Sequence, residues 1–253
     1  MGTLTGQQLV DRALVTLQDA NAVRWKAAES LMWINDAQRE VCIYLPSAYT
    51  KTAIPALVAG TKQTASGLGL TDCVQILKVP RNFASNGTTV GRAITVRPMP
   101  WMDEQFQTWH SDTAGELIHA FVDAADPKTF YHWPPAVAGN RAEVVYAAVP
   151  PELAALSDVI SLDDVYANAM QYYLLFRAFG INSTFTKSPQ SSATYYSLFL
   201  QALGIKDQRR RAADPNLQMQ GDGAGVAGPA AARVRRFHRA RGAETTAPRA
   251  DLP

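Results

Sequence analysis

The chain has 253 residues, 47% of them hydrophobic and 18% charged, with a formal net charge of +2. These fractions are ordinary for a globular protein, and the length suffices for one full core or two small ones. No apolar run approaches the roughly 18 residues that a membrane helix needs, which excludes a membrane-spanning protein, and residues 1–6 lack the basic and apolar pattern of a signal peptide. We therefore expect a protein that works in the cytoplasm where it is made, without a membrane partner.

The charge is distributed unevenly along the chain. Residues 205–253 carry ten basic and five acidic residues and a single aromatic one, Phe237, whereas residues 1–204 carry 14 basic and 17 acidic residues. A segment of this composition cannot bury enough apolar surface to offset its ordering entropy, so we expect an extended tail that is disordered or ordered by a partner. A mildly acidic body with a basic arm favours a protein that inserts into a larger assembly.

Residues 1–47 are predicted to form a helical hairpin. Thr5 and Gln8 have the spacing of a capping box, and apolar residues recur behind them at helical intervals. A polar break at residues 19–23 precedes a second helix over residues 25–45, which Pro46 ends. The short connection predicts that the two helices are antiparallel.

Residues 48–160 are predicted to form a β-rich insert domain. Turn signals such as Asn86-Gly87 separate short β-like runs. Strands are expected at residues 74–79, 93–97, 118–123, 129–133 and 142–148, and a short helix at residues 103–110. Pro134-Pro135 is expected to end the fourth of these strands. Strands at this spacing predict a small antiparallel sheet or sandwich.

Residues 161–204 are predicted to form a helical pair that completes the helical core. Ser161 with Asp164 has the spacing of a second capping box, ahead of a helix over residues 162–179. Pro189 opens the last helix and Gly204 ends it. The predicted fold class is therefore α+β, with a four-helix core of two N-terminal and two C-terminal helices. An antiparallel β domain is inserted into it, and residues 205–253 form a basic extended tail.

The sequence predicts no catalytic, cofactor or metal site. The histidines do not form an H-E-x-x-H motif or a Cys/His cluster. His110, Ser111 and Asp112 are the residue types of a catalytic triad, but adjacent positions do not usually converge on one reacting atom. We therefore expect that the protein is not an enzyme and binds no cofactor.

Two groups of residues are candidates for partner binding. Trp101, Phe106 and Trp109 lie next to prolines that indicate a surface excursion; they either pack against the sheet or anchor an interface. The second group lies in the basic tail: Arg209, Arg210, Arg211, Arg233, Arg235, Arg236, Phe237, Arg239 and Arg241. These side chains either contact nucleic-acid phosphates or dock into an acidic groove of a protein partner. A solvated arm that aids solubility is the third interpretation.

Several segments together resemble a known family. They are Val23-Arg24-Trp25 followed by residues 33–40 (WINDAQRE), residues 126–135 (DPKTFYHWPP) and residues 164–169 (DVYANA). Their order and spacing over residues 3–204 resemble the phage adaptor proteins at the head–tail junction, similar to the tail tubular protein A of short-tailed phages. Residues 205–253 lie outside this resemblance.

The resemblance implies a structural virion protein that is assembled in the host cytoplasm. Such a protein forms a closed ring of about twelve subunits beneath the portal protein and carries a lower tail or nozzle protein. DNA passes through the channel without sequence-specific binding. For the basic tail, which the resemblance does not cover, our own hypothesis is that it docks on the portal or on neighbouring subunits and becomes ordered there. The alternative is a nucleic-acid-binding protein that uses the arginine-rich tail.

Overall fold

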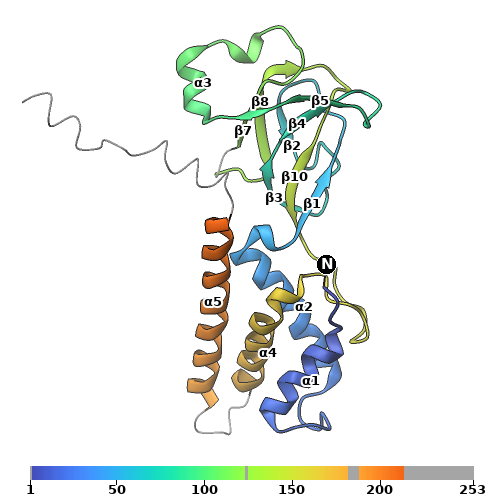
Figure 1. Ribbon diagram of the computed structural model, residues 1–253, viewed down its shortest axis with the longest axis vertical. Coiled ribbons are helices and arrows are strands. Elements are labelled where there is room, and N and C mark those ends of the chain that lie inside the picture. The colour runs from blue at the N-terminus through green and yellow to red at the C-terminus, as the bar shows by residue number, and fades with distance from the viewer. Residues whose placement is uncertain (1, 123–124, 182–187, 214–253) are drawn as a thin grey trace, which may run out of the picture. The chain divides into compact units, whose positions relative to one another are not determined.

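The computed structural model describes residues 2–122, 125–181 and 188–213. The chain divides into two units, Met1–Gly204 and Ile205–Pro253. In the first unit, two helices precede a series of strands and further helices follow, which confirms the predicted α+β class (Figure 1). Within the described ranges, no helix combines the length and the apolar character that crossing a membrane requires.

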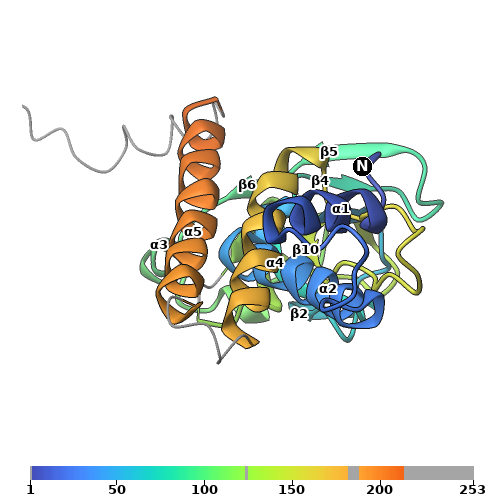
Figure 2. The same cartoon turned by 90° about the horizontal axis from the view of Figure 1, so that it is seen from below.

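Helices from both ends of the described chain make up the helical part. They are α1 (Gly6–Leu17), α2 (Ala27–Tyr44), α4 (Ala167–Ile181) and α5 (Ser188–Ala213). The predicted capping box begins α1, because the backbone N–H of Gln8 donates to Thr5 Oγ1 and that of Thr5 donates to Gln8 Oε1. Helix α4 packs against both α1 and α2 (Figure 2).

A single carboxylate organises the connection between α1 and α2. Asp19 accepts hydrogen bonds from the backbone N–H groups of Val23, Arg24 and Trp25, at 3.0, 2.9 and 3.1 Å. Although desolvation acts to raise it, these bonds hold the pKa of Asp19 below its usual value. These three hydrogen bonds hold the backbone so that Trp25 points inward, where its ring packs edge-on against that of Trp33 with 6.0 Å between the ring centroids.

The capping box predicted at Ser161 and Asp164 is wrong. Asp163 caps a short 3-10 turn, η3 (Asp164–Tyr166), by accepting from the N–H of Val165 at 3.0 Å, and α4 follows directly. Asp164 instead accepts from the hydroxyl and the backbone N–H of Thr3, at 2.6 and 2.8 Å, and from the N–H of Leu4. These bonds lower the pKa of Asp164, and its carboxylate fixes the start of the chain rather than a helix end.

The last helix does not end at Gly204 as predicted. Helix α5 continues to Ala213, so residues 205–213 are helical rather than extended. A glycine inside a helix costs only about 1 kcal/mol relative to alanine. Lys, Gln and Arg are good helix formers, and Lys206, Gln208 and Arg209 follow within five residues.

Strands in the described part of the chain form three sheets. The first has the order β1 (Thr50–Ala53), β10 (Val144–Ala148), β3 (Cys73–Lys78). The second has the order β2 (Gly60–Thr64), β8 (Thr129–Ala136), β7 (His119–Val122), β6 (Thr95–Val96). The third has the order β5 (Val90–Ala93), β4 (Arg81–Phe83), β9 (Arg141–Ala142).

The β region is mixed, not purely antiparallel as predicted. Strands β6 and β7 pair in parallel, with Thr95 opposite His119, while the other named pairs are antiparallel. Parallel neighbours need a crossover connection, because the chain has to return to the same end of the sheet. Residues 97–118 form that crossover. It contains α3 (Met99–Gln105) and the 3-10 turn η2 (Trp109–Ser111).

Two boundaries differ from the sequence prediction for reasons that involve proline. Strand β8 continues through Pro134 and Pro135 to Ala136. Proline has no backbone N–H to donate, but the pairing of β8 with β2 is irregular beside Gly60, so the two prolines lie where regular ladder bonds are absent. The helix predicted at residues 103–110 begins earlier, at Met99. Proline favours the first turn of a helix, where its missing N–H has no partner to lose.

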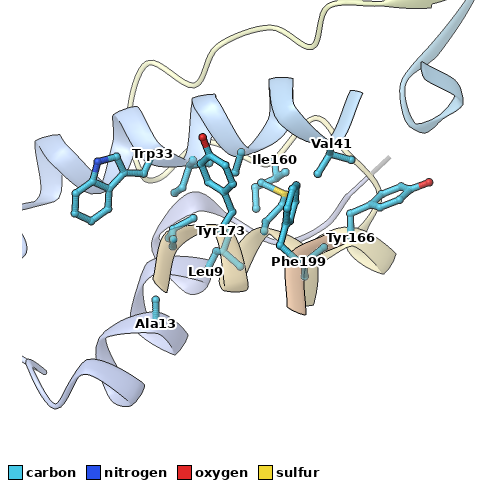
Figure 3. Close-up of a cluster of buried hydrophobic side chains, with 14 of the residues drawn as sticks. Leu9, Ala13, Trp33, Val41, Ile160, Tyr166, Tyr173 and Phe199 are labelled. Carbon is cyan, nitrogen blue, oxygen red and sulfur yellow. The ribbon is translucent and has the colours of Figure 1, made fainter. Parts of the chain in front are cut away.

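Three clusters of buried side chains stabilise the structure. The first joins the helices and includes Leu9, Ala13, Trp33, Val41, Ile160, Tyr166, Tyr173 and Phe199 (Figure 3). The second fills the β region and includes Leu57, Ile76, Leu117, Phe130, Ala142 and Val144. The third, which we call the outer cluster, consists of Met102, Trp109 and Phe121. Tyr49 packs against both the first and the second cluster and so connects the two parts.

The chain returns from β10 to η3 through residues 149–163, which we call the return segment. Two buried amides of α2 hold one side of it. Asn35 donates to the carbonyl of Leu153 at 3.2 Å and accepts from its N–H at 2.9 Å. Gln38 accepts from the N–H of Ser161 at 3.0 Å. Asn35 and Gln38 are polar residues on the buried face of α2 because they supply these bonds.

The N-terminal end of α1 holds the other side of the return segment. The N–H groups of Gly6 and Gln7 donate to the carbonyls of Asp158 and Leu156, at 3.0 and 2.7 Å. Gly6 suits this close approach, since an added Cβ would lie 3.0 Å from the side chain of Leu153. The return segment is therefore hydrogen-bonded to two helices although it contains no helix or regular strand itself.

Removal of the Asn35 amide is expected to destabilise the whole unit. Asn35→Ala leaves the N–H and carbonyl of Leu153 buried without their partners, which costs about 2–4 kcal/mol of unfolding free energy. Urea denaturation followed by circular dichroism measures the loss. Asn168→Ala, at an exposed position of α4, is the matched control and should cost less than about 1 kcal/mol. Equal effects of the two substitutions would contradict this role of Asn35.

His132 is expected to make stability depend on pH. The side chain is fully buried, and its Nδ1–H donates to the carbonyl of Pro134 at 2.9 Å, while Gln63 Nε2 donates to His132 Nε2 at 3.3 Å. Burial lowers the pKa of His132 to about 4, from an ordinary value near 6.5. The unfolded chain therefore binds a proton between these values that the folded chain does not.

The free energy of unfolding should consequently be highest above pH 6.5 and fall as the pH drops toward 4, by up to about 3 kcal/mol from this residue. Urea titrations at half-unit steps from pH 4.5 to 7.5 measure the slope. His132→Gln removes the titrating group and should flatten the slope above pH 5, where most carboxylates of the unfolded chain are already ionised. An unchanged slope in that variant would show that His132 is not its source.

Candidate protein interface

The crossover at residues 97–118 covers the outer face of the second sheet. Side chains alternate along β8, so Phe130 and His132 are buried on the inner face while Tyr131 and Trp133 face outward. Phe121 on β7 lies opposite Tyr131 and also belongs to the outer cluster. The second sheet thus has packed side chains on both faces.

Trp109 is the central residue of the outer cluster. Its side chain is 2% exposed, and its ring lies 5.4 Å from that of Phe121. The indole N–H donates to Asp103 Oδ1 at 2.9 Å, which satisfies the one polar atom of the side chain. Trp109 therefore packs against the sheet, as the first of the two interpretations for these aromatics has it.

Trp101 and Phe106 belong to a row of rings at the edge of the outer cluster, which we call the aromatic row. In order it consists of Phe106, Trp133, His119 and Trp101. Phe106 stacks on Trp133 and Trp133 stacks on His119, each with 5.9 Å between ring centroids. Trp101 meets His119 edge-on at 5.4 Å. Phe106 is 53% exposed, so this end of the row is available to a partner.

Cations lie over two rings of this surface. Arg97 lies 5.3 Å from the ring centroid of Trp101, and Lys62 lies 5.7 Å from that of Tyr131. Burial, together with the charge of Arg97, lowers the pKa of His119, so its ring favours the neutral form. The surface therefore combines aromatic rings with positive charge, a combination suited to contacts with carboxylates or further aromatic side chains.

Two of the three triad-type residues, His110 and Asp112, bond to different partners rather than to each other. The ring of His110 stacks on Trp109 at 3.6 Å, and its Nδ1 is 2.9 Å from the hydroxyl of Thr61. Asp112 accepts from the indole N–H of Trp133 at 2.9 Å. Within the described ranges, no group of three His, Cys, Asp or Glu side chains is arranged to hold a metal ion.

The basic candidates fall into two groups. Arg209, Arg210 and Arg211 lie near the end of α5. The remaining candidates lie outside the described residues: Arg233, Arg235, Arg236, Phe237, Arg239 and Arg241.

The sequence prediction missed Trp133, His119 and Arg97 as members of this surface. Side chains alternate along residues 129–133, so the sequence alone predicts that Trp133 lies on the face of the sheet opposite His132. The contact with His119 depends on the register between β7 and β8, in which these two residues lie opposite each other. Strand register is decided by tertiary pairing and is not visible in one strand alone.

The polar groups around this surface serve to position the backbone and the rings. Trp109 and Trp133 each donate to a carboxylate of the crossover, and Asn82 donates to the carbonyl of Leu117 at 2.7 Å and accepts from its N–H.

The model of the SU10 adaptor protein family matches residues 4–219, and the chain belongs to this family. No match is found among curated proteins. Membership confirms the expectation of a phage adaptor, a structural component of the virion that interacts with portal and tail proteins. The match extends past Gly204 through the whole of α5. The narrower similarity to tail tubular protein A stays a prediction.

Substitutions at Trp109 and Phe106 are expected to have different effects. Trp109→Ala empties the middle of the outer cluster and should lower the unfolding free energy by about 3–5 kcal/mol. Phe106→Ala removes a half-exposed ring and should cost less than about 1.5 kcal/mol. Urea denaturation measures both. A larger loss at Phe106 than at Trp109 would contradict the packing described above.

Proposed function

We propose that this protein forms a ring beneath the portal at the head–tail junction and links the portal to the next tail component. Membership of the SU10 adaptor protein family is the observation that carries this proposal. In this proposal the subunits form a closed ring of about twelve copies, since identical heterologous contacts close into rings. The four helices α1, α2, α4 and α5 act as one scaffold for the lateral contacts.

The charge distribution supports a role for the C-terminal tail in attachment. Ten basic residues lie in residues 205–253, and four of them, Lys206, Arg209, Arg210 and Arg211, lie in the part of α5 that follows Gly204. A basic segment attached to a mildly acidic body can contact an acidic partner surface that would repel the body itself. In our proposal the tail docks on the portal or on a neighbouring subunit.

The same distribution suits passage of DNA through the ring. Residues 1–204 carry 14 basic and 17 acidic residues, and acidic walls repel phosphates. We propose that DNA slides through the channel without sequence-specific binding. The alternative, a nucleic-acid-binding protein that uses the arginine-rich tail, predicts an affinity for free DNA that falls steeply with salt.

Cryo-electron microscopy of the full chain mixed with portal from the same virus tests the proposal. A closed ring on the portal is the expected result. Absence of any complex, combined with DNA binding that weakens from 50 to 200 mM salt, would replace the proposal with the nucleic-acid alternative.

Removing the three arginines at the end of α5 is expected to weaken portal attachment by at least about tenfold, because several ion pairs are lost together. The variant is Arg209→Gln, Arg210→Gln and Arg211→Gln in the full chain. Light-scattering or surface-binding titrations against portal measure the affinity. The matched control removes three positive charges from the body, by Arg12→Gln, Lys26→Gln and Arg92→Gln.

The control should bind portal within about threefold of the unmodified chain. A second variant that ends at Ala213 keeps α5 complete and tests the remaining tail separately. Normal attachment by both variants would exclude the tail as the portal-binding element.

A further inference from the structure

Two neighbouring loops form an exposed apolar tip on the β region. The first follows β1 and comprises residues 54–59; the second follows β8 and comprises residues 137–139, and we call the pair the two-loop tip. Val58 and Val137 are each 50% exposed, and Ala56, Ala59 and Ala138 are exposed as well. Solvent-exposed apolar residues are common singly, but a contiguous group of them marks an interaction site.

Hydrogen bonds place the two loops side by side. The N–H of Leu57 donates to the carbonyl of Asn140 at 2.7 Å, and the N–H of Gly139 donates to the carbonyl of Leu57 at 3.2 Å. Gly60 lies opposite Ala136 at the adjoining end of β2 and β8. Residues 58–59 therefore lie across from residues 137–138, and the exposed valines belong to one surface.

Buried side chains hold the first loop in a fixed conformation. Gln63 is 1% exposed and brackets Val58, accepting from its N–H at 2.9 Å and donating to its carbonyl at 2.6 Å. Leu57 is 3% exposed and anchors the loop in the second cluster. Arg141 donates to the carbonyl of Ile54 at 2.9 Å. The exposed valines are thus presented by a preorganised backbone, which lowers the entropic cost of binding.

The two-loop tip carries no charge. Residues 52–61 and 134–140 contain no Asp, Glu, Lys or Arg, although 18% of the chain is charged. The nearby guanidinium of Arg141 is bonded to the loop carbonyls of Ile54 and Ser85. An uncharged rigid surface fits a partner surface that is also apolar and uncharged, since a buried unpaired charge on either side would be costly.

The tip lies at the end of the first sheet away from the helices. Strand β1 starts at Thr50, next to Tyr49, which packs against the helical cluster, and it ends at Ala53. The loop of residues 54–59 follows that far end. In the proposed function the helices make the lateral contacts of the ring, so the tip is left to another partner.

We infer that the two-loop tip docks on an apolar, uncharged surface of the next tail component. This inference rests on the proposed function, in which the protein links the portal to the next tail component. Val58 and Val137 are the residues whose burial drives the contact, and the Gln63 bracket positions the first of them.

The test uses the complex of portal with the full-length adaptor, mixed with each purified tail protein of the same virus. Val58→Asp with Val137→Asp should weaken binding of the tail protein at least about 100-fold, because two carboxylates would be desolvated. Val58→Ala with Val137→Ala should weaken it about tenfold without adding charge. Val15→Asp with Val90→Asp is the matched control, since these valines are 74% and 56% exposed elsewhere on the protein.

Each outcome has one meaning. A ring of the tip variant on the portal that does not recruit the tail protein supports the inference when the control recruits it normally. Recruitment by the tip variant equal to that of the unmodified chain overturns it. If the tip variant no longer forms a ring on the portal while the control still does, the tip makes a contact between copies of this chain. That result also overturns the inference. Binding of the unmodified chain, but not of the tip variant, to phosphatidylcholine vesicles overturns it in favour of a bilayer. Failure of the unmodified chain to bind portal would refute the proposed function instead.

Discussion

The return segment is the constraint on which the arrangement of the first unit depends. The chain leaves the helices after α2, builds three sheets, and has to return to begin α4. Residues 149–163 accomplish this without regular secondary structure, so their backbone groups need partners from elsewhere. Asn35 and Gln38 supply them from α2, and Gly6 and Gln7 supply them from α1. The amide side chains therefore join the β region to the helices.

The parallel pair of β6 and β7 has a comparable consequence for the surface. It requires a crossover, and residues 97–118 cover the outer face of the second sheet. Trp109 fixes the crossover by burial, and the aromatic row forms where its edge meets β7 and β8. Phe106 is therefore exposed beside Trp133 because the crossover between β6 and β7 places it there, and not because of a local sequence motif.

Surface properties differ along the chain in a way that suits an adaptor with several partners. The C-terminal residues from 205 onward are basic, the aromatic row combines rings with cations, and the two-loop tip is apolar and uncharged. Different chemistry at each surface lets one subunit discriminate between partners, because a contact that suits one is unfavourable for another. The buried polar side chains serve this arrangement by fixing backbones; Gln63 is the clearest case, since it brackets Val58 and also donates to His132.

The sequence by itself determined the α+β class, the start of α1 at its capping box and the approximate positions of most strands, because these follow from local periodicity and turn chemistry. It did not determine where α5 ends or what Asp164 binds. A helix continues past Gly204 when its neighbours favour it, and Asp164 finds Thr3 more than 150 residues away. The sequence singled out Trp101 and Phe106, but only the tertiary structure assembled the aromatic row and the two-loop tip, since strand register and pairing between distant loops bring their residues together.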